Sequence, residues 1–143
     1  AMALGNHPFG AVLVAPDHQT VLFTQCNIDT VNHAESTLAR IAASNYPAEY
    51  LWQCTLYTAV EPCCMCAGTI YWANIGRVVY GMTEQRLLQC TGNHQENHQE
   101  NPTMSVSSAY VFAHGQKNID LIGPVAEIEE QTAALQQAFW TER

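Results

Sequence analysis

The sequence has few basic side chains, and this shortage limits the partners that it can bind. Only five of its 143 residues are lysine or arginine, against 13 aspartates and glutamates, so the formal net charge is −8. Such a surface repels a phosphate backbone, whereas proteins that bind large nucleic acids gain affinity from basic groups on phosphates. The basic residues are also scattered, at positions 40, 77, 86, 117 and 143. We therefore expect a small-molecule partner and no large nucleic acid.

Long apolar runs are missing as well. No run approaches the roughly 20 apolar residues that a helix needs to cross a bilayer, and the chain does not open on the basic start and apolar stretch of a secretory signal. We expect a cytoplasmic protein without a membrane contact. A chain of this length is sufficient for one hydrophobic core and too short for two, so residues 1–143 are predicted to form a single domain.

The order of strand-like and helix-like segments predicts an α/β protein. Two short apolar runs, at residues 9–15 and 20–24, surround a turn-like segment and predict a β-hairpin. Apolar residues at helical spacing predict a helix over 32–44, with Asn32 as its N-cap and a start just before His33. Strands and helices then alternate, at residues 55–60, 63–73, 77–81, 84–90, 119–122 and 126–140. This alternation is typical of a mainly parallel sheet that helices cover on both faces.

The six cysteines indicate metal or redox chemistry, because a chain of this size forms a core without disulfides and two cysteines have Cys-x-x-Cys spacing. Zinc prefers thiolate and imidazole ligands, and a catalytic zinc ion keeps three protein ligands and one water. Residues three apart share a helix face, so Cys63 and Cys66 can reach one ion while Cys64 points elsewhere and packs. With His33 as the third ligand, we expect one zinc ion per subunit.

Glu35 follows His33 by two residues, so the two side chains cannot point in the same direction on a regular helix. This argues against Glu35 as a fourth ligand of the metal. We place Glu35 beside the metal's water, where a carboxylate can take a proton and return it to the nitrogen that leaves as ammonia. A His-x-Glu at one helix start and a Pro-Cys-x-x-Cys at another, each after a strand-like run, is the specific pattern of zinc-dependent base deaminases.

Each part of this pattern also has a simpler interpretation. Glu35 could complete a capping box with Asn32, and His33 could be a surface residue at a helix start. The two cysteines could form a redox pair, or a structural zinc site in a protein without catalysis. His94 and His98 lie in a duplicated Asn-His-Gln-Glu segment, where the acid is misplaced relative to the His-Glu-x-x-His motif of metalloproteases.

With these motifs the sequence resembles the cytidine deaminase superfamily, and most closely the branch that contains bacterial guanine deaminase and the tRNA adenosine deaminases. The similarity covers about the first 85 residues and is carried by the segments 8–12, 33–35, 56–68 and 70–73. The resemblance implies a three-layer α/β/α fold with a mixed five-stranded sheet, a homodimer, and zinc-dependent hydrolytic deamination of an amino-substituted base ring.

The resemblance also implies contacts with the substrate. Asn27 matches an asparagine that hydrogen-bonds the base, and Ala34 offers its backbone N–H to a ring carbonyl or nitrogen. Phe9 and Trp72 match apolar and aromatic residues of the guanine-type pocket, although core packing would explain both equally well. The C-terminal segment with Phe139-Trp140 is a candidate lid over its own site or that of the partner subunit.

The sequence departs from the family in three places. Only five residues separate Asn27 from His33, the family's first helix has no counterpart before the first strand, and no aspartate lies between Gly81 and Pro102, where guanine-type enzymes have an acidic residue that reads the base's amino group. Taken together, the motifs and the resemblance predict a zinc-dependent deaminase of a free nucleobase or nucleoside, foremost a guanine-type purine. The alternatives are adenosine in a tRNA anticodon, and cytosine or cytidine.

Overall fold

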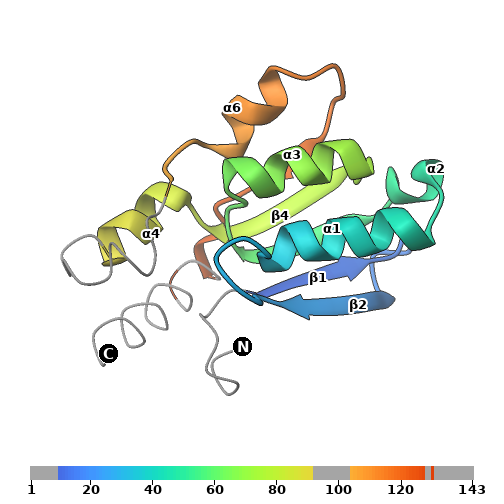
Figure 1. Cartoon of the computed structure of the whole chain (residues 1–143), viewed down its shortest axis with the longest axis horizontal. Coiled ribbons are helices and arrows are strands. Elements are labelled where there is room, and N and C mark those ends of the chain that lie inside the picture. The colour runs from blue at the N-terminus through green and yellow to red at the C-terminus, as the bar shows by residue number, and fades with distance from the viewer. Residues whose placement is uncertain (1–9, 92–103, 128–129, 131–143) are drawn as a thin grey trace.

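Five strands form one sheet in the order β2-β1-β3-β4-β5 in the computed structural model, which describes residues 10–91, 104–127 and 130 (Figure 1). The strands are β1 (Gly10–Val14), β2 (Val21–Cys26), β3 (Thr55–Val60), β4 (Arg77–Met82) and β5 (Asp120–Ile122). β1 runs antiparallel to both of its neighbours, whereas β3, β4 and β5 are parallel. The sheet is therefore mixed, as the family resemblance implies.

The alternation of strands and helices predicts a mainly parallel sheet. This prediction is wrong, because two of the four strand pairs are antiparallel. The predicted hairpin is confirmed as β1 and β2, and a tight turn reverses the chain, so it makes an antiparallel pair. In that turn the Asp17 carboxylate accepts hydrogen bonds from the backbone N–H groups of Gln19 and Thr20. The connections from β2 to β3, from β3 to β4 and from β4 to β5 each contain helices and return the chain in the same direction, but β3 pairs with β1 and not with β2.

The described helices are α1 (Ala34–Asn45), α2 (Ala48–Leu51), α3 (Cys64–Ala73), α4 (Glu84–Thr91) and α6 (Ser108–Ala113). The predicted helices over 32–44, 63–73 and 84–90 are confirmed within two residues. The sequence did not predict α2 and α6, because four and six residues are too few to show helical periodicity. The one local signal for α6 is Ser107, whose side chain accepts a hydrogen bond from the backbone N–H of Tyr110.

The predicted start of α1 is wrong. The N-cap is His33, with extended backbone angles, and the helix begins one residue after it. Asn32 does not cap the helix, because its amide group has other partners: Nδ2 donates to the Asp29 carboxylate at 3.2 and 3.3 Å, and Oδ1 accepts a hydrogen bond from Arg40 at 2.9 Å. The motif histidine therefore lies on extended backbone at the end of a loop.

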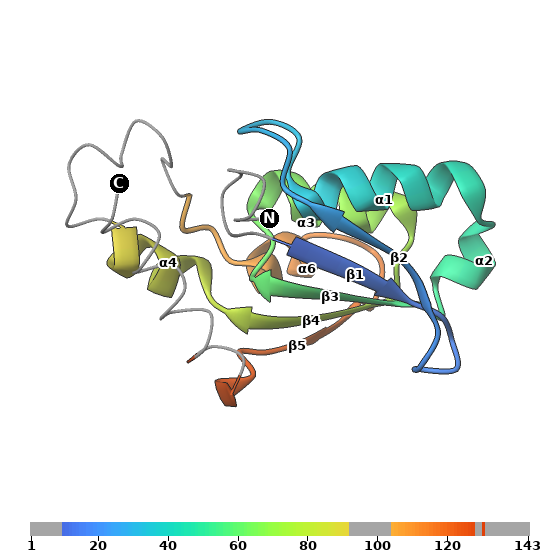
Figure 2. The same ribbon diagram turned by 90° about the horizontal axis from the view of Figure 1, so that it is seen from below.

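Helices α1 and α3 lie side by side on one face of the sheet, and α6 lies beside α3 (Figures 1 and 2). The core between these helices and the sheet is mainly apolar; its largest fully buried side chains include Leu13, Leu38, Leu56, Ile70 and Val78. The predicted closing helix over 126–140 lies almost wholly outside the described residues. Among the described helices, none has the length and apolar character that a bilayer crossing requires.

Candidate active site

The candidate site lies where the first turns of α1 and α3 meet the carboxyl end of β3. β3 ends at Val60, and Glu61 and Pro62 lead directly to Cys63, the N-cap of α3. Because α1 and α3 pack side by side, the loop before α1 brings His33 to the same place. Thus two segments that lie 30 residues apart in the sequence supply polar groups to one point.

His33, Cys63 and Cys66 form a triangle of candidate ligand atoms. The Nδ1 atom of His33 lies 3.5 Å from each sulfur, and the two sulfurs lie 3.6 Å apart. With bonds of about 2.05 Å to nitrogen and about 2.3 Å to sulfur, tetrahedral angles separate N from S by about 3.6 Å and S from S by about 3.8 Å. The three residues are thus close enough to hold a metal ion, and their spacing fits zinc.

The other ring nitrogen of His33 has its own partner, which fixes the orientation of the ring. Nε2 lies 2.9 Å from the carbonyl oxygen of Thr30 and donates to it when it carries the proton. In this tautomer Nδ1 is unprotonated and turns its lone pair toward the two sulfurs. Histidines that bind metals commonly have such a carbonyl partner behind them, so this contact supports a metal-binding role.

The contact between the two thiols shifts their pKa values in opposite directions. The contact with the Cys66 sulfur and, after it, the contact with His33 lower the pKa of Cys63, which favours its thiolate form. The contact with the Cys63 sulfur and burial raise the pKa of Cys66. Zinc would displace the proton of Cys66 on binding, because zinc binds thiolates and not thiols.

Glu35 is a buried carboxylate beside these three residues. Its side chain is 5% exposed, and Oε1 accepts a hydrogen bond of 2.6 Å from the hydroxyl of Thr58 on β3. Burial raises the pKa of Glu35, while the hydrogen bond from Thr58 opposes this shift. Glu35 also interacts electrostatically with His33 and both candidate thiols. A carboxyl group that is held near a metal and has a raised pKa is suited to proton transfer.

Two residues that the sequence analysis missed support the loop before Cys63. The carboxylate of Glu61 accepts a hydrogen bond of 2.7 Å from the backbone N–H of Ser108, and the hydroxyl of Ser108 donates to the carbonyl oxygen of Pro62 at 2.7 Å. Both contacts are buried and tie the start of α6 to the loop. An acid and a serine 47 residues apart give no sequence signal for this pairing.

The structure places the predicted substrate contacts differently from one another. Asn27 is buried directly after β2, and Ala34 is buried as the first residue of α1, next to His33. Trp72 is 79% exposed and lies nine residues, or roughly 13 Å along the α3 axis, from Cys63. Phe9 lies outside the described residues. So do Phe139-Trp140 and the duplicated segment with His94 and His98.

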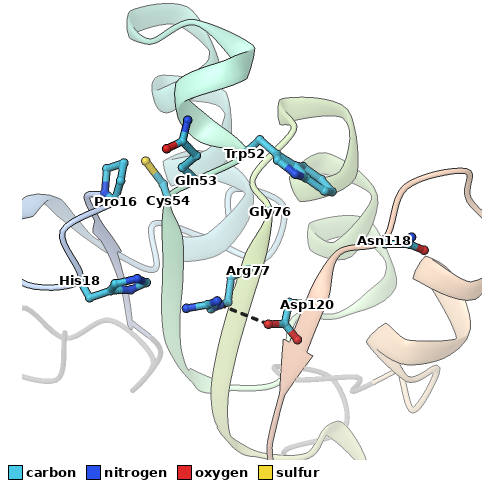
Figure 3. Close-up of a pocket in the computed structure, with 9 residues that line it drawn as sticks. All are labelled: Pro16, His18, Trp52, Gln53, Cys54, Gly76, Arg77, Asn118 and Asp120. Atoms are coloured by element: carbon cyan, nitrogen blue, oxygen red, sulfur yellow. Dashed lines mark hydrogen bonds and ion pairs between the residues drawn. The ribbon is translucent and has the colours of Figure 1, made fainter.

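A cavity of about 350 Å³ lies at the opposite end of the sheet, where β3, β4 and β5 begin (Figure 3). An ion pair at 3.3 Å between Arg77 Nε and Asp120 Oδ2 forms part of its wall. The other lining residues are Pro16, His18, Trp52, Gln53, Cys54, Gly76 and Asn118. None of the predicted site residues that the structure describes lines this cavity, so it is separate from the candidate metal site.

The family described as the cytidine and deoxycytidylate deaminase zinc-binding region matches residues 1–82 of the chain. The match covers more than half of the sequence and includes His33, Glu35, Cys63 and Cys66. The chain therefore belongs to this family of zinc-binding deaminases. The predicted superfamily, the predicted zinc cofactor and the predicted class of hydrolase, one that acts on C–N bonds, are confirmed at this level.

Individual relatives differ in the substrate that their names give. The chain is 46% identical over 77 residues to guanine deaminase of Bacillus subtilis (strain 168), which covers 51% of the chain and 49% of that protein. It is 38% identical over 91 residues to tRNA-specific adenosine deaminase of Haemophilus influenzae, covering 60% and 52%. It is 28% identical over 139 residues to "Probable cytosine deaminase" of Schizosaccharomyces pombe, covering 95% and 81%. The chain thus spans about half the length of the first two.

A solved structure confirms the predicted fold class. Guanine deaminase from Nitrosomonas europaea superimposes with a TM-score of 0.69 over 98% of the chain and 76% of that protein, at 18% identity. Similarity at this identity shows the fold alone. It supports the three-layer α/β/α arrangement around the mixed five-stranded sheet that is described above.

Proposed function

We propose that the chain is a zinc-dependent hydrolytic deaminase that acts on a free nucleobase or nucleoside and releases ammonia. The observation that carries the proposal is the meeting of His33, Cys63 and Cys66 at the spacing of zinc ligands, with buried Glu35 beside them. A structural zinc site has four protein ligands and needs no such carboxylate. Only three candidate ligands gather here among the described residues, which leaves a position for water.

In the proposed reaction each residue has one task. His33, Cys63 and Cys66 hold the metal ion, which when bound acidifies its water and stabilises the developing negative charge. Glu35 accepts a proton at its carboxylate and delivers it to the amino nitrogen that leaves the ring. The backbone N–H of Ala34 and the side chain of Asn27 orient the ring by hydrogen bonds.

For the substrate we propose a guanine-type purine base. The 46% identity to a guanine deaminase extends over 77 residues and supports this choice. The net charge of −8 also favours a small neutral ring over a polyanion. Cytosine is the second candidate, because the similarity to the relative named for cytosine extends over 95% of the chain, and because the region between Gly81 and Pro102 has no aspartate to read a guanine amino group.

Ammonia release by the zinc-loaded protein tests the function and the substrate together. We expect turnover of guanine, or of cytosine if the second candidate is correct, in a set that also contains guanosine, cytidine, adenine and a tRNA anticodon stem-loop. Glu35→Ala should keep its zinc and lose about 10³-fold or more in turnover, whereas Glu49→Ala, at an exposed glutamate on α2, should match the wild type.

Three outcomes would change the proposal. Near-normal turnover by Glu35→Ala contradicts the role of this carboxylate. Inosine formation in the stem-loop without turnover of free bases would favour a tRNA adenosine deaminase, the function named for the relative that is 38% identical. If the wild type holds zinc and deaminates nothing in the set, the protein binds zinc but lacks the proposed activity.

We also propose that residues 1–143 form a single deaminase domain that assembles as a homodimer in the cytoplasm. A reducing compartment keeps Cys63 and Cys66 available for a metal ion. Apolar side chains that are exposed on α3 and just before and within α6 provide surface for a second copy: Met65, Trp72, Met104 and Tyr110. The proposed dimer also allows the C-terminal segment with Phe139-Trp140 to close the site of either subunit.

A further inference from the structure

Two threonines on β3 are buried to a similar extent but differ in their hydrogen bonds. Thr55 is 1% exposed and Thr58 is 6% exposed. The hydroxyl of Thr58 lies 2.6 Å from Oε1 of Glu35 and 3.0 Å from the carbonyl oxygen of Val60. The hydroxyl of Thr55 is the one buried side-chain polar atom in the described part of the chain that has no hydrogen-bond partner. Thr58 is therefore tied to the candidate site, and Thr55 is not.

The contact between Thr58 and Glu35 has the length of a strong hydrogen bond. Bonds from a hydroxyl to a carboxylate are typically 2.5–2.7 Å long and roughly twice as strong as neutral ones. The hydroxyl has one hydrogen and two acceptors within reach, and the shorter distance identifies Glu35 as the acceptor of that hydrogen. The second contact, with the carbonyl oxygen of Val60, further restricts the position of the Thr58 hydroxyl.

Thr58 is also a rigid anchor. It pairs with Ala11 of β1 and with Tyr80 of β4, so its backbone is held on both sides in the middle of the sheet. Its β-branched side chain has few allowed χ1 angles. Glu35 has a long side chain with several rotatable bonds, and its backbone lies on a helix that packs across this sheet. A fixed hydroxyl can therefore hold a carboxylate that would otherwise rotate.

We infer that Thr58 is a positioning residue for the proposed deamination: it holds one oxygen of Glu35 so that the carboxylate keeps a fixed orientation beside His33, Cys63 and Cys66. The inference rests on the proposed function, in which Glu35 transfers the proton. Proton transfer needs the donor and acceptor at hydrogen-bonding distance, and a displacement of about 1 Å can cost 10²-fold in rate. Thr58 acts through Glu35 and need not contact the substrate.

The test compares three substitutions on the same strand. Thr58→Val keeps the shape of the side chain and removes the hydroxyl, Thr58→Ser keeps the hydroxyl, and Thr55→Val removes the buried hydroxyl that has no partner. We expect Thr58→Val to lower kcat about 10- to 100-fold, with KM and zinc content within twofold of the wild type. Thr58→Ser should recover most of kcat, and Thr55→Val should leave kcat unchanged.

Crystal structures of the zinc-loaded wild type, Thr58→Val and Thr55→Val give a readout that does not depend on activity. We expect the Glu35 carboxylate to be ordered in the wild type and in Thr55→Val, and to be rotated or disordered in Thr58→Val. An unchanged carboxylate in Thr58→Val would overturn the inference, as would an unchanged kcat, or a loss that Thr58→Ser does not reverse or that parallels a loss of zinc. If the wild type deaminates no substrate, the proposed function fails, while these structures still decide whether Thr58 positions Glu35.

Discussion

Neighbouring cysteines in the motif differ in what their sulfurs contact. The sulfurs of Cys63 and Cys66 lie within 3.6 Å of each other and within 3.5 Å of His33. The sulfur of Cys64 lies 3.6 Å from the sulfur of Met104, outside this group. The predicted packing role of Cys64 agrees with this contact, because residues one apart on a helix face different directions.

This difference predicts the effect of two matched substitutions on zinc binding. Cys66→Ser removes a candidate ligand. It should therefore lower the affinity for zinc by more than the 10- to 100-fold that is typical for loss of a ligand's hydrogen-bond partner. Cys64→Ser removes only a packing sulfur and should retain near-normal affinity. Chelator competition and metal analysis of both purified variants provide the measurement. Equal zinc affinity in the two variants would contradict the ligand assignment.

At the scale of the elements, the turn between α3 and β4 depends on a close approach of two backbones. A Cβ atom at Gly76 would lie 1.9 Å from the carbonyl oxygen of Trp52, at the end of α2. No Cβ atom fits at that distance, and the atoms that it would meet belong to the backbone of Trp52, which cannot rotate away as a side chain could. By contrast, a Cβ atom at Gly68, inside α3, would have nothing within 4 Å.

These two glycines predict opposite changes in stability. Gly76→Ala should destabilise the fold by about 3 kcal/mol, because the added methyl group forces the β4 start away from α2. Gly68→Ala should stabilise it by roughly 0.5–1 kcal/mol, since alanine loses less conformational entropy in a helix. Urea unfolding of both variants measures the two free energies. A neutral Gly76→Ala would show that the close contact with Trp52 is relaxed in solution.

At the scale of the whole molecule, the charge and the exposed apolar groups bear on assembly. Two copies with a net charge of −8 each repel one another, so a dimer needs a contact surface of low charge. Trp72 is the most exposed of the large apolar side chains described, at 79%, and lies on the outer face of α3.

Light scattering of the zinc-loaded protein tests the proposed homodimer. We expect a mass of twice 15.8 kDa for the wild type, and a shift toward the monomer for Trp72→Glu. Val21→Glu places the same charge on an exposed apolar position of edge strand β2 and should remain dimeric. A monomeric wild type would exclude the dimer, and a dimeric Trp72→Glu would move the interface elsewhere.

The sequence by itself determined the family, the candidate ligands and the chemistry. His33, Cys63 and Cys66 were predictable because each follows a strand-like run at a helix start, and because the i, i+3 spacing of the cysteines aligns them locally. The hairpin and the three longer helices were predictable for the same reason: turn residues and hydrophobic periods act over a few neighbouring residues.

Only the tertiary structure decided the antiparallel pairing of β1 with β3, the true N-cap of α1, and the partners of Glu35 and Glu61. Thr58 and Glu35 are 23 residues apart, and Ser108 and Glu61 are 47 apart. Their hydrogen bonds exist because α1 packs on the face of the sheet and because α6 packs against α3. Such contacts follow from the packing of whole elements and the exclusion of water between them, which no local spacing of residues records.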